Sequence, residues 1–205
     1  MFDFQSESSD SSIDSYRLRR SRAMILHALK NPLVVGAVAA ASPRLARDVV
    51  SHVEPGCNVV VELGAGTGVI TQALLQQRSN RHGVVAIEID PQLADIARTR
   101  LGAAANILVG DALQLESYFD ESQVDCIICS LPLTLLSSQD LDALLTGARS
   151  VLKSDGRFVF YLYRMGFWRH RYHRVIEKVR CHFPQIRENR TVWRNLPPAR
   201  VIVCH

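Results

Sequence analysis

A glycine-rich loop after an apolar strand is the feature that most restricts how this chain can fold. Residues 58–68 read NVVVELGAGTG, so an apolar run leads through three glycines into a helix expected at 67–78. Glycines at such a turn let the backbone bend sharply and approach a ligand beside a helix N-terminus. The spacing is G-x-G-x-G. Val69 takes the third glycine position of the dinucleotide-binding fingerprint, and the Lys-Ser/Thr pair of a P-loop does not follow.

Strand-like and helix-like runs alternate from this loop onwards. The expected strands are 58–63, 83–89, 106–110, 124–129 and 156–163, and the expected helices between them are 67–78, 91–102 and 138–152. This alternation predicts a parallel sheet with helices on both faces. A helix near 167–182, a strand near 185–194, a proline turn at 195–198 and a last strand, ARVIVC, predict an antiparallel hairpin at the sheet edge. The expected fold class is therefore α/β, with a seven-stranded, mostly parallel sheet.

The chain of 205 residues suits one domain with an N-terminal extension. Residues 1–15 are acidic and serine-rich, which predicts a disordered tail. Residues 16–41 are expected to form a short amphipathic helix and a small-residue connector. The main domain is expected at 42–205, beginning with a helix that Ser42 caps and that runs to about Val53.

Basic residues gather near both ends of the chain, whose formal net charge is +4. One cluster contains Arg17, Arg19, Arg20 and Arg22, and a second basic block runs through 164–200. These clusters predict an anionic partner, nucleic acid or a membrane surface, although solvated helix faces would look the same. In the N-terminal helix, arginines alternate with apolar side chains, which favours an anionic lipid interface. The residues expected there are Arg17, Arg19, Arg20, Arg22, Ile25, Leu26 and Leu29. No run approaches the roughly 20 apolar residues of a spanning helix, and no signal peptide is evident.

Five cysteines are an odd number for a disulfide framework and predict free thiols in a reducing cytoplasm. Cys126 and Cys129 have the spacing of a metal or redox pair, but they lie in the strand-like run VDCIICSL without a second pair. We interpret them as buried strand cysteines and expect no metal.

The glycine-rich loop, with its preceding acid, resembles the first motif of the S-adenosylmethionine (SAM)-dependent methyltransferases with a Rossmann-like fold. Two later positions agree: Glu88 and Ile89 end the second strand, where an acid can accept both ribose hydroxyls, and Asp111 and Ala112 follow the third. The resemblance implies SAM as cofactor and S-adenosylhomocysteine as product. The cofactor residues it implies are Glu62, Gly64, Ala65, Gly66, Thr67, Gly68, Glu88, Ile89, Asp111, Ala112 and Ser130. A relic that no longer binds, or another nucleotide, is the alternative.

The tip of the fourth strand, where this superfamily usually holds the acceptor, reads Ser130-Leu131-Pro132-Leu133. It resembles the Asn-Leu-Pro-Tyr/Phe motif of rRNA adenine dimethyltransferases, but serine replaces the asparagine and leucine the aromatic residue. A flipped base would lose a stacking partner worth about 1–3 kcal/mol. The chain resembles the bacterial phospholipid N-methyltransferases over more of its length, at residues 31–38, at this Leu-Pro-Leu and at the signature NLPPARV of residues 195–201.

The stretch YLYRMGFWRHRYHR at 161–174 interleaves aromatic and basic side chains. Aromatic faces can hold a methylated ammonium, arginine can bind a lipid phosphate, and histidine or tyrosine can accept a proton. The alternative is that the tyrosines belong to the core and the arginines to a solvated helix face. The expected catalytic residues are Ser130, Leu131, Tyr172 and His173, and the expected substrate contacts are Pro132, Leu133, Tyr163 and Arg200.

The resemblance thus implies a phospholipid N-methyltransferase that converts phosphatidylethanolamine stepwise towards phosphatidylcholine. We expect it to lie peripherally on the inner face of the cell membrane, with an anionic membrane and phospholipid as partners and without nucleic acid or a protein partner. An RNA adenine N6-methyltransferase and a non-catalytic SAM-binding module are the alternatives.

Overall fold

Seven strands form one sheet in the order β3-β2-β1-β4-β5-β7-β6. The computed structural model describes residues 41–77, 83–164, 169–193 and 195–205. Strands β1 to β5 pair in parallel, and β7 runs antiparallel between β5 and β6. The strand bounds are β1 Val60–Leu63, β2 Val84–Glu88, β3 Asn106–Val109, β4 Val124–Cys129, β5 Leu152–Tyr163, β6 Ile186–Val192 and β7 Ala199–Cys204. The Rossmann-like, mostly parallel sheet with an antiparallel C-terminal pair is confirmed.

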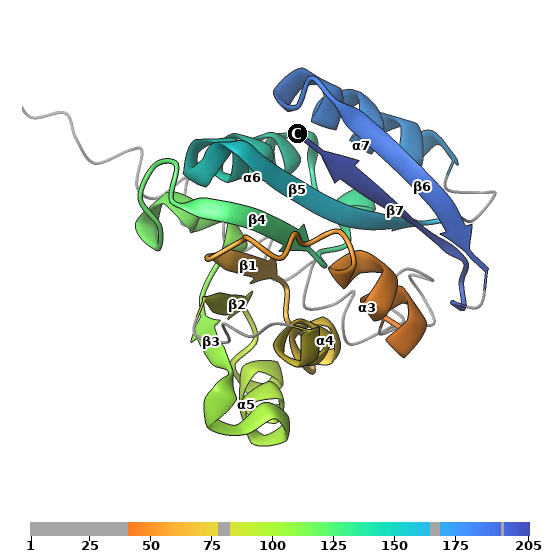
Figure 1. The fold of residues 1–205 in the computed structure, drawn as a ribbon. Helices are drawn as coiled ribbons and strands as arrows, with labels where there is room; N and C mark the ends of the chain where they lie inside the picture. The colour runs from red at the N-terminus through yellow and green to blue at the C-terminus, as the bar shows by residue number, and fades with distance from the viewer. Residues whose placement is uncertain (1–40, 78–82, 165–168, 194) are drawn as a thin grey trace, which may run out of the picture.

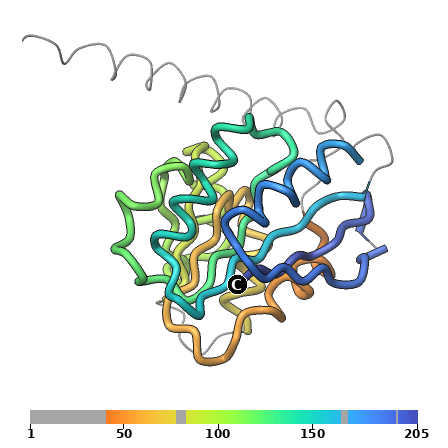
Figure 2. The backbone as a smooth tube through the Cα atoms, turned by 90° about the horizontal axis from the view of Figure 1, so that it is seen from above, coloured from red at the N-terminus to blue at the C-terminus, as the bar shows by residue number. Residues whose placement is uncertain are grey.

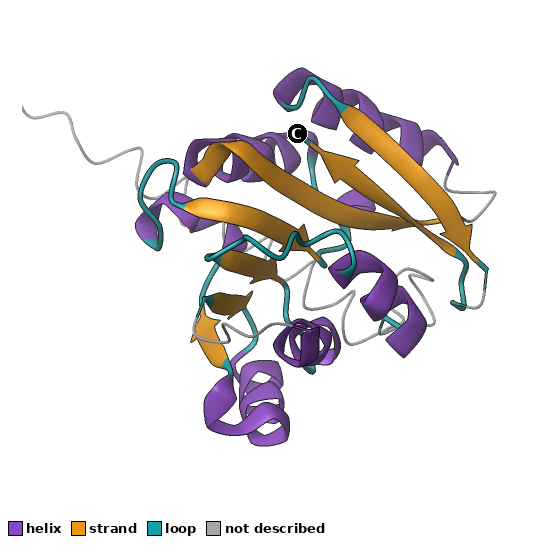
Figure 3. Ribbon diagram, in the orientation of Figure 1, coloured by secondary structure: helices purple, strands orange, loops and turns teal. Residues whose placement is uncertain are grey.

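Helices cover both faces of this sheet (Figures 1 and 3). The helix bounds are α3 Pro43–Val50, α4 Val69–Gln77, α5 Pro91–Leu101, α6 Ser138–Val151 and α7 Arg169–His182. Buried side chains of α3 and α4 pack on the face that carries Val60, and those of α5 pack on the same face at β2 and β3. The other face carries Val61 and Leu63 and is covered by α6 and α7. Because the helices cover the two faces, the ends of the strands are where polar side chains can form a binding site.

The helix starts follow the capping residues in the sequence. Ser42 Oγ accepts the Leu45 N–H at 3.2 Å, and Pro43 supplies the fixed φ that suits a first turn. Asp90 caps α5 before Pro91 in the same way. The expected first helix of the domain was too long, because α3 ends at Val50. The fifth strand was expected too short, because β5 follows α6 without a loop and begins at Leu152.

The C-terminal strands complete the sheet beside β5, as the view from above shows (Figure 2). Because β6 is antiparallel to β7, it runs in the direction of β1 to β5. The turn between β6 and β7 therefore lies at the same edge of the sheet as the carboxyl ends of the parallel strands. The N-terminus of α3 is fastened to this turn, since the Ser42 N–H donates to Asn195 Oδ1 at 3.0 Å.

The two cysteines with metal-like spacing are buried on opposite faces of β4, Cys126 toward α4 and Cys129 toward α6, so the interpretation as strand cysteines is confirmed. The expected disordered tail, the N-terminal helix and the membrane residues from Arg17 to Leu29 lie outside the described residues. In the described ranges, no helix is long and apolar enough to cross a bilayer.

Candidate active site

A pocket opens at the carboxyl ends of β1 to β4, which we call the loop pocket. Its walls come from the glycine-rich loop, the ends of β2 and β3, and the segment after β4. It is lined by Gly64, Gly66, Ile87, Glu88, Ile89, Gly110, Asp111, Ala112, Leu113, Ser130, Leu131, Pro132 and Leu136. Four neighbouring strands thus bring residues spread over 64–136 to one point.

The glycine-rich loop adopts backbone angles that favour glycine. Gly64 and Gly66 have φ of 81° and 55°, in the left-handed region. A Cβ on Gly64 would lie 2.8 Å from Leu131 Cδ2, so the loop and the acceptor segment pack closely there. Gly66 has open space at this position, which leaves room for a ligand against bare backbone.

Glu88 lies at the end of β2 with its carboxylate against the loop. Its Oε2 accepts the Gly66 N–H at 2.7 Å, and its Oε1 accepts the Asp90 N–H at 3.0 Å. Burial raises the pKa of Glu88, and the backbone N–H groups of Asp90 and Gly66 act in the opposite direction. A carboxylate held in this way has lone pairs left for two vicinal hydroxyls, as on a ribose.

Asp111 begins a 3-10 helix, η2, at Ala112–Ser117. Its Oδ1 accepts the Leu113 N–H at 3.0 Å, and its own N–H donates to the Tyr118 hydroxyl at 3.1 Å. The other carboxylate oxygen is a free acceptor site for an amine of the kind adenine carries. Together with the bare backbone at Gly66 and the Glu88 carboxylate, this donor and acceptor set fits an adenosyl group.

The structure brings most of the expected cofactor residues to the loop pocket. Gly64, Gly66, Glu88, Ile89, Asp111, Ala112 and Ser130 line it. Glu62, Ala65, Thr67 and Gly68 do not line it; a Cβ on Gly68 would meet Leu101 of α5 at 2.9 Å, so this glycine serves helix packing. Ile87, Gly110 and Leu113 line the pocket and were not predicted, although each is within two residues of one that was.

Glu62 is buried beneath the loop, 1% exposed, and forms a polar network. Thr71 Oγ donates to its Oε2 at 2.5 Å, and Ser130 Oγ donates to its Oε1 at 3.3 Å. Burial raises the pKa of Glu62 to about 8, against the two hydroxyl donors, and the nearby Glu88 charge raises it further. Ser130 therefore joins a buried proton-binding carboxyl to the loop pocket.

The acceptor segment differs from expectation at one position. Leu133 is fully buried in the core and does not line the pocket, because residues Leu133–Leu135 form a 3-10 turn, η3, that turns it inward. Leu131, Pro132 and Leu136 supply the apolar wall instead. The Leu131 carbonyl already accepts the Leu133 N–H at 2.8 Å, which leaves one lone pair for a substrate amine.

A second hollow, the tyrosine pocket, lies at the end of β5 and is closed by α7, β6 and β7. It is lined by Tyr163, Arg164, Arg169, Tyr172, His173, Glu188, Trp193 and Arg200. The four residues predicted from the 161–174 stretch and the closing signature, namely Tyr163, Tyr172, His173 and Arg200, thus meet in one place. Glu188 and Trp193 were not predicted for it, because only the strand pairing shows that β6 reaches this edge.

A hydrogen-bonded network crosses the tyrosine pocket. The Tyr172 hydroxyl donates to Glu188 Oε2 at 2.8 Å, and Arg200 Nη1 lies 2.6 Å from the same oxygen. Burial, followed by the contact with Glu188, raises the pKa of Tyr172 to about 12. Tyr172 therefore keeps its proton more firmly than a free tyrosine does, and its expected catalytic role stays a prediction. Burial also raises the pKa of Tyr163 to about 12.

Arg174, the residue after His173 on α7, ties this helix to the segment after β4. Its Nη2 donates to the carbonyl oxygens of Thr134 and Leu136 at 3.2 and 2.8 Å. The acceptor segment is therefore held against α7, and the pockets lie along one edge of the sheet at the ends of neighbouring β4 and β5. Across the described part of the chain, no group of three or more His, Cys, Asp or Glu could hold a metal ion.

A family model described as a methyltransferase domain matches residues 60–156. An ornithine lipid N-methyltransferase of Singulisphaera acidiphila is 28% identical over 181 residues, which are 85% of this chain and 90% of that protein. A dimethyladenosine transferase of Saccharomyces cerevisiae is 34% identical over 100 residues, 46% of this chain but 27% of that protein.

Solved structures share the fold at low identity. A TehB-like SAM-dependent methyltransferase from Corynebacterium glutamicum has a TM-score of 0.58 at 18% identity, covering 95% of this chain and 97% of that one. A glycopeptide N-methyltransferase complexed with SAM has a TM-score of 0.53 at 21% identity, covering 62% of this chain and 57% of that one. Open α/β sheets of this kind bind ligands at the carboxyl ends of their strands, which is where the loop pocket lies.

Proposed function

We propose that this SAM-dependent methyltransferase transfers methyl groups to the primary amine of a membrane lipid, taking phosphatidylethanolamine stepwise towards phosphatidylcholine. The observation that carries the proposal is the acceptor segment. Its contribution to the loop pocket is one hydroxyl, from Ser130, and the apolar side chains of Leu131, Pro132 and Leu136. No amide or aromatic side chain is among the described lining residues, although a flipped base is commonly held by both.

A relative that aligns with this chain over most of its own length supports the proposal. The ornithine lipid N-methyltransferase aligns over 90% of its own length. Ornithine, like ethanolamine, ends in a primary amine, so the two lipids present the same reacting group. The chain covers less than a third of the dimethyladenosine transferase that it matches, so that similarity is confined to part of the other protein.

Methyl transfer requires a neutral amine next to an electrophilic methyl group, which SAM supplies when bound. The Leu131 carbonyl and Ser130 Oγ are the groups of this chain that can orient the amine. When the amine sheds a proton, Ser130 Oγ takes it and passes its own proton to Glu62, 3.3 Å away. With a pKa of about 8, Glu62 is matched to this task at mildly alkaline pH. His173 is the second candidate acceptor.

The tyrosine pocket suits the rest of a lipid headgroup. The rings of Tyr163 and Tyr172 offer faces to a methylated ammonium, and arginines in the same pocket offer charge to an anionic group. Arg200 is already paired with Glu188, so Arg164 and Arg169 are the freer candidates for the anion. The enzyme then acts as a peripheral protein on the cytoplasmic face of an anionic membrane.

An RNA adenine N6-methyltransferase is the second candidate, favoured by the partial similarity to a dimethyladenosine transferase. Incubation with labelled SAM and either mixed liposomes or total RNA separates the two. Liposomes should contain phosphatidylethanolamine in one sample and ornithine lipid in another, with phosphatidylcholine alone as the control. We expect label in an amino-lipid sample only; label in RNA, or in neither fraction, would overturn the proposal.

A further inference from the structure

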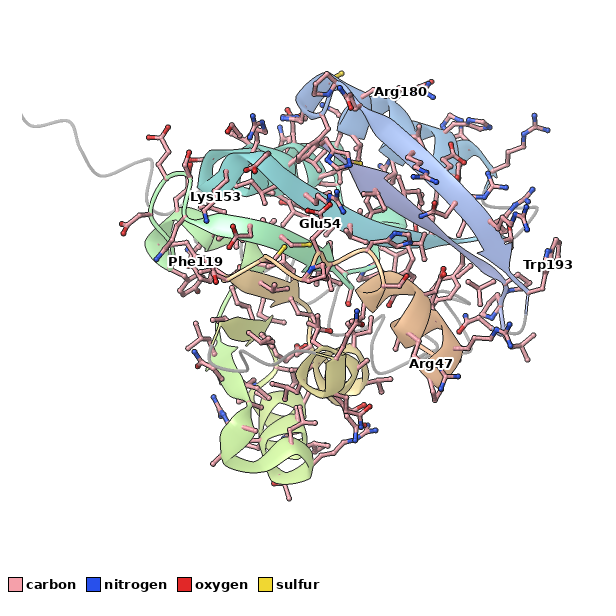
Figure 4. All side chains as sticks on the ribbon, in the orientation of Figure 1. Arg47, Glu54, Phe119, Lys153, Arg180 and Trp193 are labelled. Atoms are coloured by element: carbon pink, nitrogen blue, oxygen red, sulfur yellow. The ribbon has the colours of Figure 1, made fainter. Side chains whose placement is uncertain are left out.

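Two large apolar side chains protrude from the turn between β6 and β7. Trp193 is 72% exposed and Leu196 is 87% exposed. The other exposed large apolar residues of the described chain, Ile96 and Val109, are less exposed and lie apart on α5 and β3. Figure 4 shows Trp193 extending outward from the body of the molecule at this end of the sheet. We call Trp193 and Leu196 the tip.

Hydrogen bonds hold the described residues beside the tip. Asn195, between the two apolar residues, is 2% exposed. Its side chain accepts the Ser42 N–H at 3.0 Å and donates to the Pro197 carbonyl at 2.7 Å. The Arg164 N–H donates to the Pro198 carbonyl at 2.7 Å. Two of these bonds fasten the turn to the start of α3 and to the residue after β5, and the third lies within the turn. A turn held in this way loses little conformational entropy when its outward side chains enter another phase.

Arginines surround the tip. Arg44 and Arg47 of α3 and Arg190 of β6 line a shallow groove together with Trp193. Arg164 lines the tyrosine pocket together with the same tryptophan, and its Nη1 lies 3.4 Å from Thr191 Oγ1. The carboxylates on these two hollows are Asp48, among the groove arginines, and Glu188, which is paired with Arg200. Positive charge therefore exceeds negative charge around the tip.

We propose that the tip is a membrane-docking element, in which Trp193 and Leu196 enter the interface of an anionic bilayer and Arg44, Arg47, Arg164 and Arg190 contact lipid phosphates. Tryptophan is suited to the interface of a bilayer, and each basic residue strengthens attachment to anionic lipid. A base could stack on Trp193, but the more exposed Leu196 offers no ring, which favours lipid over nucleic acid.

The position of the tip gives this docking a purpose, and here the inference rests on the proposed function. Trp193 lines the tyrosine pocket, so a bilayer that received the tip would lie against the mouth of that pocket. The start of α3 lies beside the same turn, because the Ser42 N–H is hydrogen-bonded to Asn195. A lipid headgroup would then reach the pocket from a membrane already in contact.

The test is flotation of the full chain with phosphatidylcholine vesicles, with and without phosphatidylglycerol, in the absence of SAM. Changing Trp193→Ser together with Leu196→Ser should weaken partitioning onto anionic vesicles by about tenfold or more. Arg44→Gln with Arg47→Gln should weaken it by about fivefold or more, on anionic vesicles only. Ile96→Ser on α5 is the matched control, since it removes an exposed apolar side chain far from the tip. Far-UV circular dichroism and the melting temperature report whether each variant folds.

Unchanged partitioning of the tip variant would overturn the proposal and leave membrane contact to other segments. The proposal would also be overturned if the wild-type chain bound single-stranded RNA through Trp193 and did not bind vesicles. Turnover of a short-chain phosphatidylethanolamine below its micelle concentration tests the proposed function separately. Leu196→Ser, which is outside both pockets, should retain that turnover while binding vesicles more weakly than the wild type. A wild type that binds vesicles through the tip but never methylates the lipid would remove the proposed function and keep the docking element.

Discussion

Replacing Glu62 with glutamine changes the charge of the buried carboxyl beneath the glycine-rich loop and almost nothing else. Glutamine has the same shape, and its carbonyl can still accept the hydrogen bond from Thr71 Oγ, while its amide can donate to Ser130 Oγ. The side chain becomes neutral at every pH. The substitution therefore isolates the free energy of ionising a group that is 1% exposed.

The expected magnitude follows from the pKa of Glu62, which is raised from 4.5 in the unfolded chain to about 8 in the fold. A carboxyl whose pKa is raised on folding contributes stability that is fully present below the unfolded pKa. That stability is lost as the pH rises toward the folded pKa. For these two values the loss between pH 5 and pH 8 is on the order of 3 kcal/mol. The glutamine variant should not show this loss.

The assay is urea unfolding followed by far-UV circular dichroism at several pH values from 5 to 8, for wild type and Glu62→Gln. The quantity of interest is the difference between the two unfolding free energies, because every other titrating group cancels in it. We expect the variant to gain on the wild type by about 3 kcal/mol across this range. Glu116→Gln, at an exposed acid, is the control. A difference for Glu62→Gln that stays constant with pH would refute the reasoning.

The same variant bears on catalysis. If Glu62 receives the amine proton through Ser130, wild-type turnover should rise with pH up to about 8. Glu62→Gln should lose most of its turnover and this rise, with SAM affinity largely kept because Glu62 does not line the loop pocket. An unchanged pH profile would assign proton transfer to another group, with His173 the next to test.

Four further changes test the rest of the structure. Glu88→Gln should weaken SAM binding about tenfold by calorimetry, because it removes a charged acceptor of two hydroxyl bonds; unchanged affinity would exclude Glu88 from the cofactor site. Gly64→Ala should cost about 1–3 kcal/mol in urea unfolding, since φ is 81° and the added Cβ meets Leu131; a stable variant would contradict this geometry. Asn195→Ala should cost about 1–3 kcal/mol by removing the two hydrogen bonds of a buried side chain, and no loss of melting temperature would refute its anchoring role. Tyr172→Phe should lower lipid turnover with SAM affinity intact, and equal turnover would remove that hydroxyl from the acceptor site.

The order of elements and the loop pocket could be predicted from the sequence because both depend on local patterns. These patterns span only a few residues each. They are apolar runs of strand length, a capping serine or aspartate before proline, and glycines that adopt the left-handed backbone. Residues at the carboxyl ends of parallel strands must then meet at one edge, so the sequence predicts that Glu88, Asp111 and Ser130 share one pocket.

The remainder depended on information that local patterns do not carry. Leu133 follows Pro132 in an apolar run that is equally consistent with a pocket wall. In the fold both Leu133 and Leu136 are buried in the core, and of the two Leu136 also lines the pocket. Glu188 lines the tyrosine pocket because β6 pairs with β7, and this pairing is not evident from the local sequence. The protonation of Glu62 follows from burial, which its place in a motif does not reveal.

The insertion of β7 between β5 and β6 has a consequence for the order in which the two pockets can form. The loop pocket is built from residues 64–136 on strands that pair with one another. Strand β6, by contrast, reaches the sheet through β7, and Glu188 of β6 forms an ion pair with Arg200 of β7. During synthesis β7 emerges after β6, so all residues of the loop pocket leave the ribosome before the tyrosine pocket can close. Cofactor binding alone therefore does not report a finished enzyme.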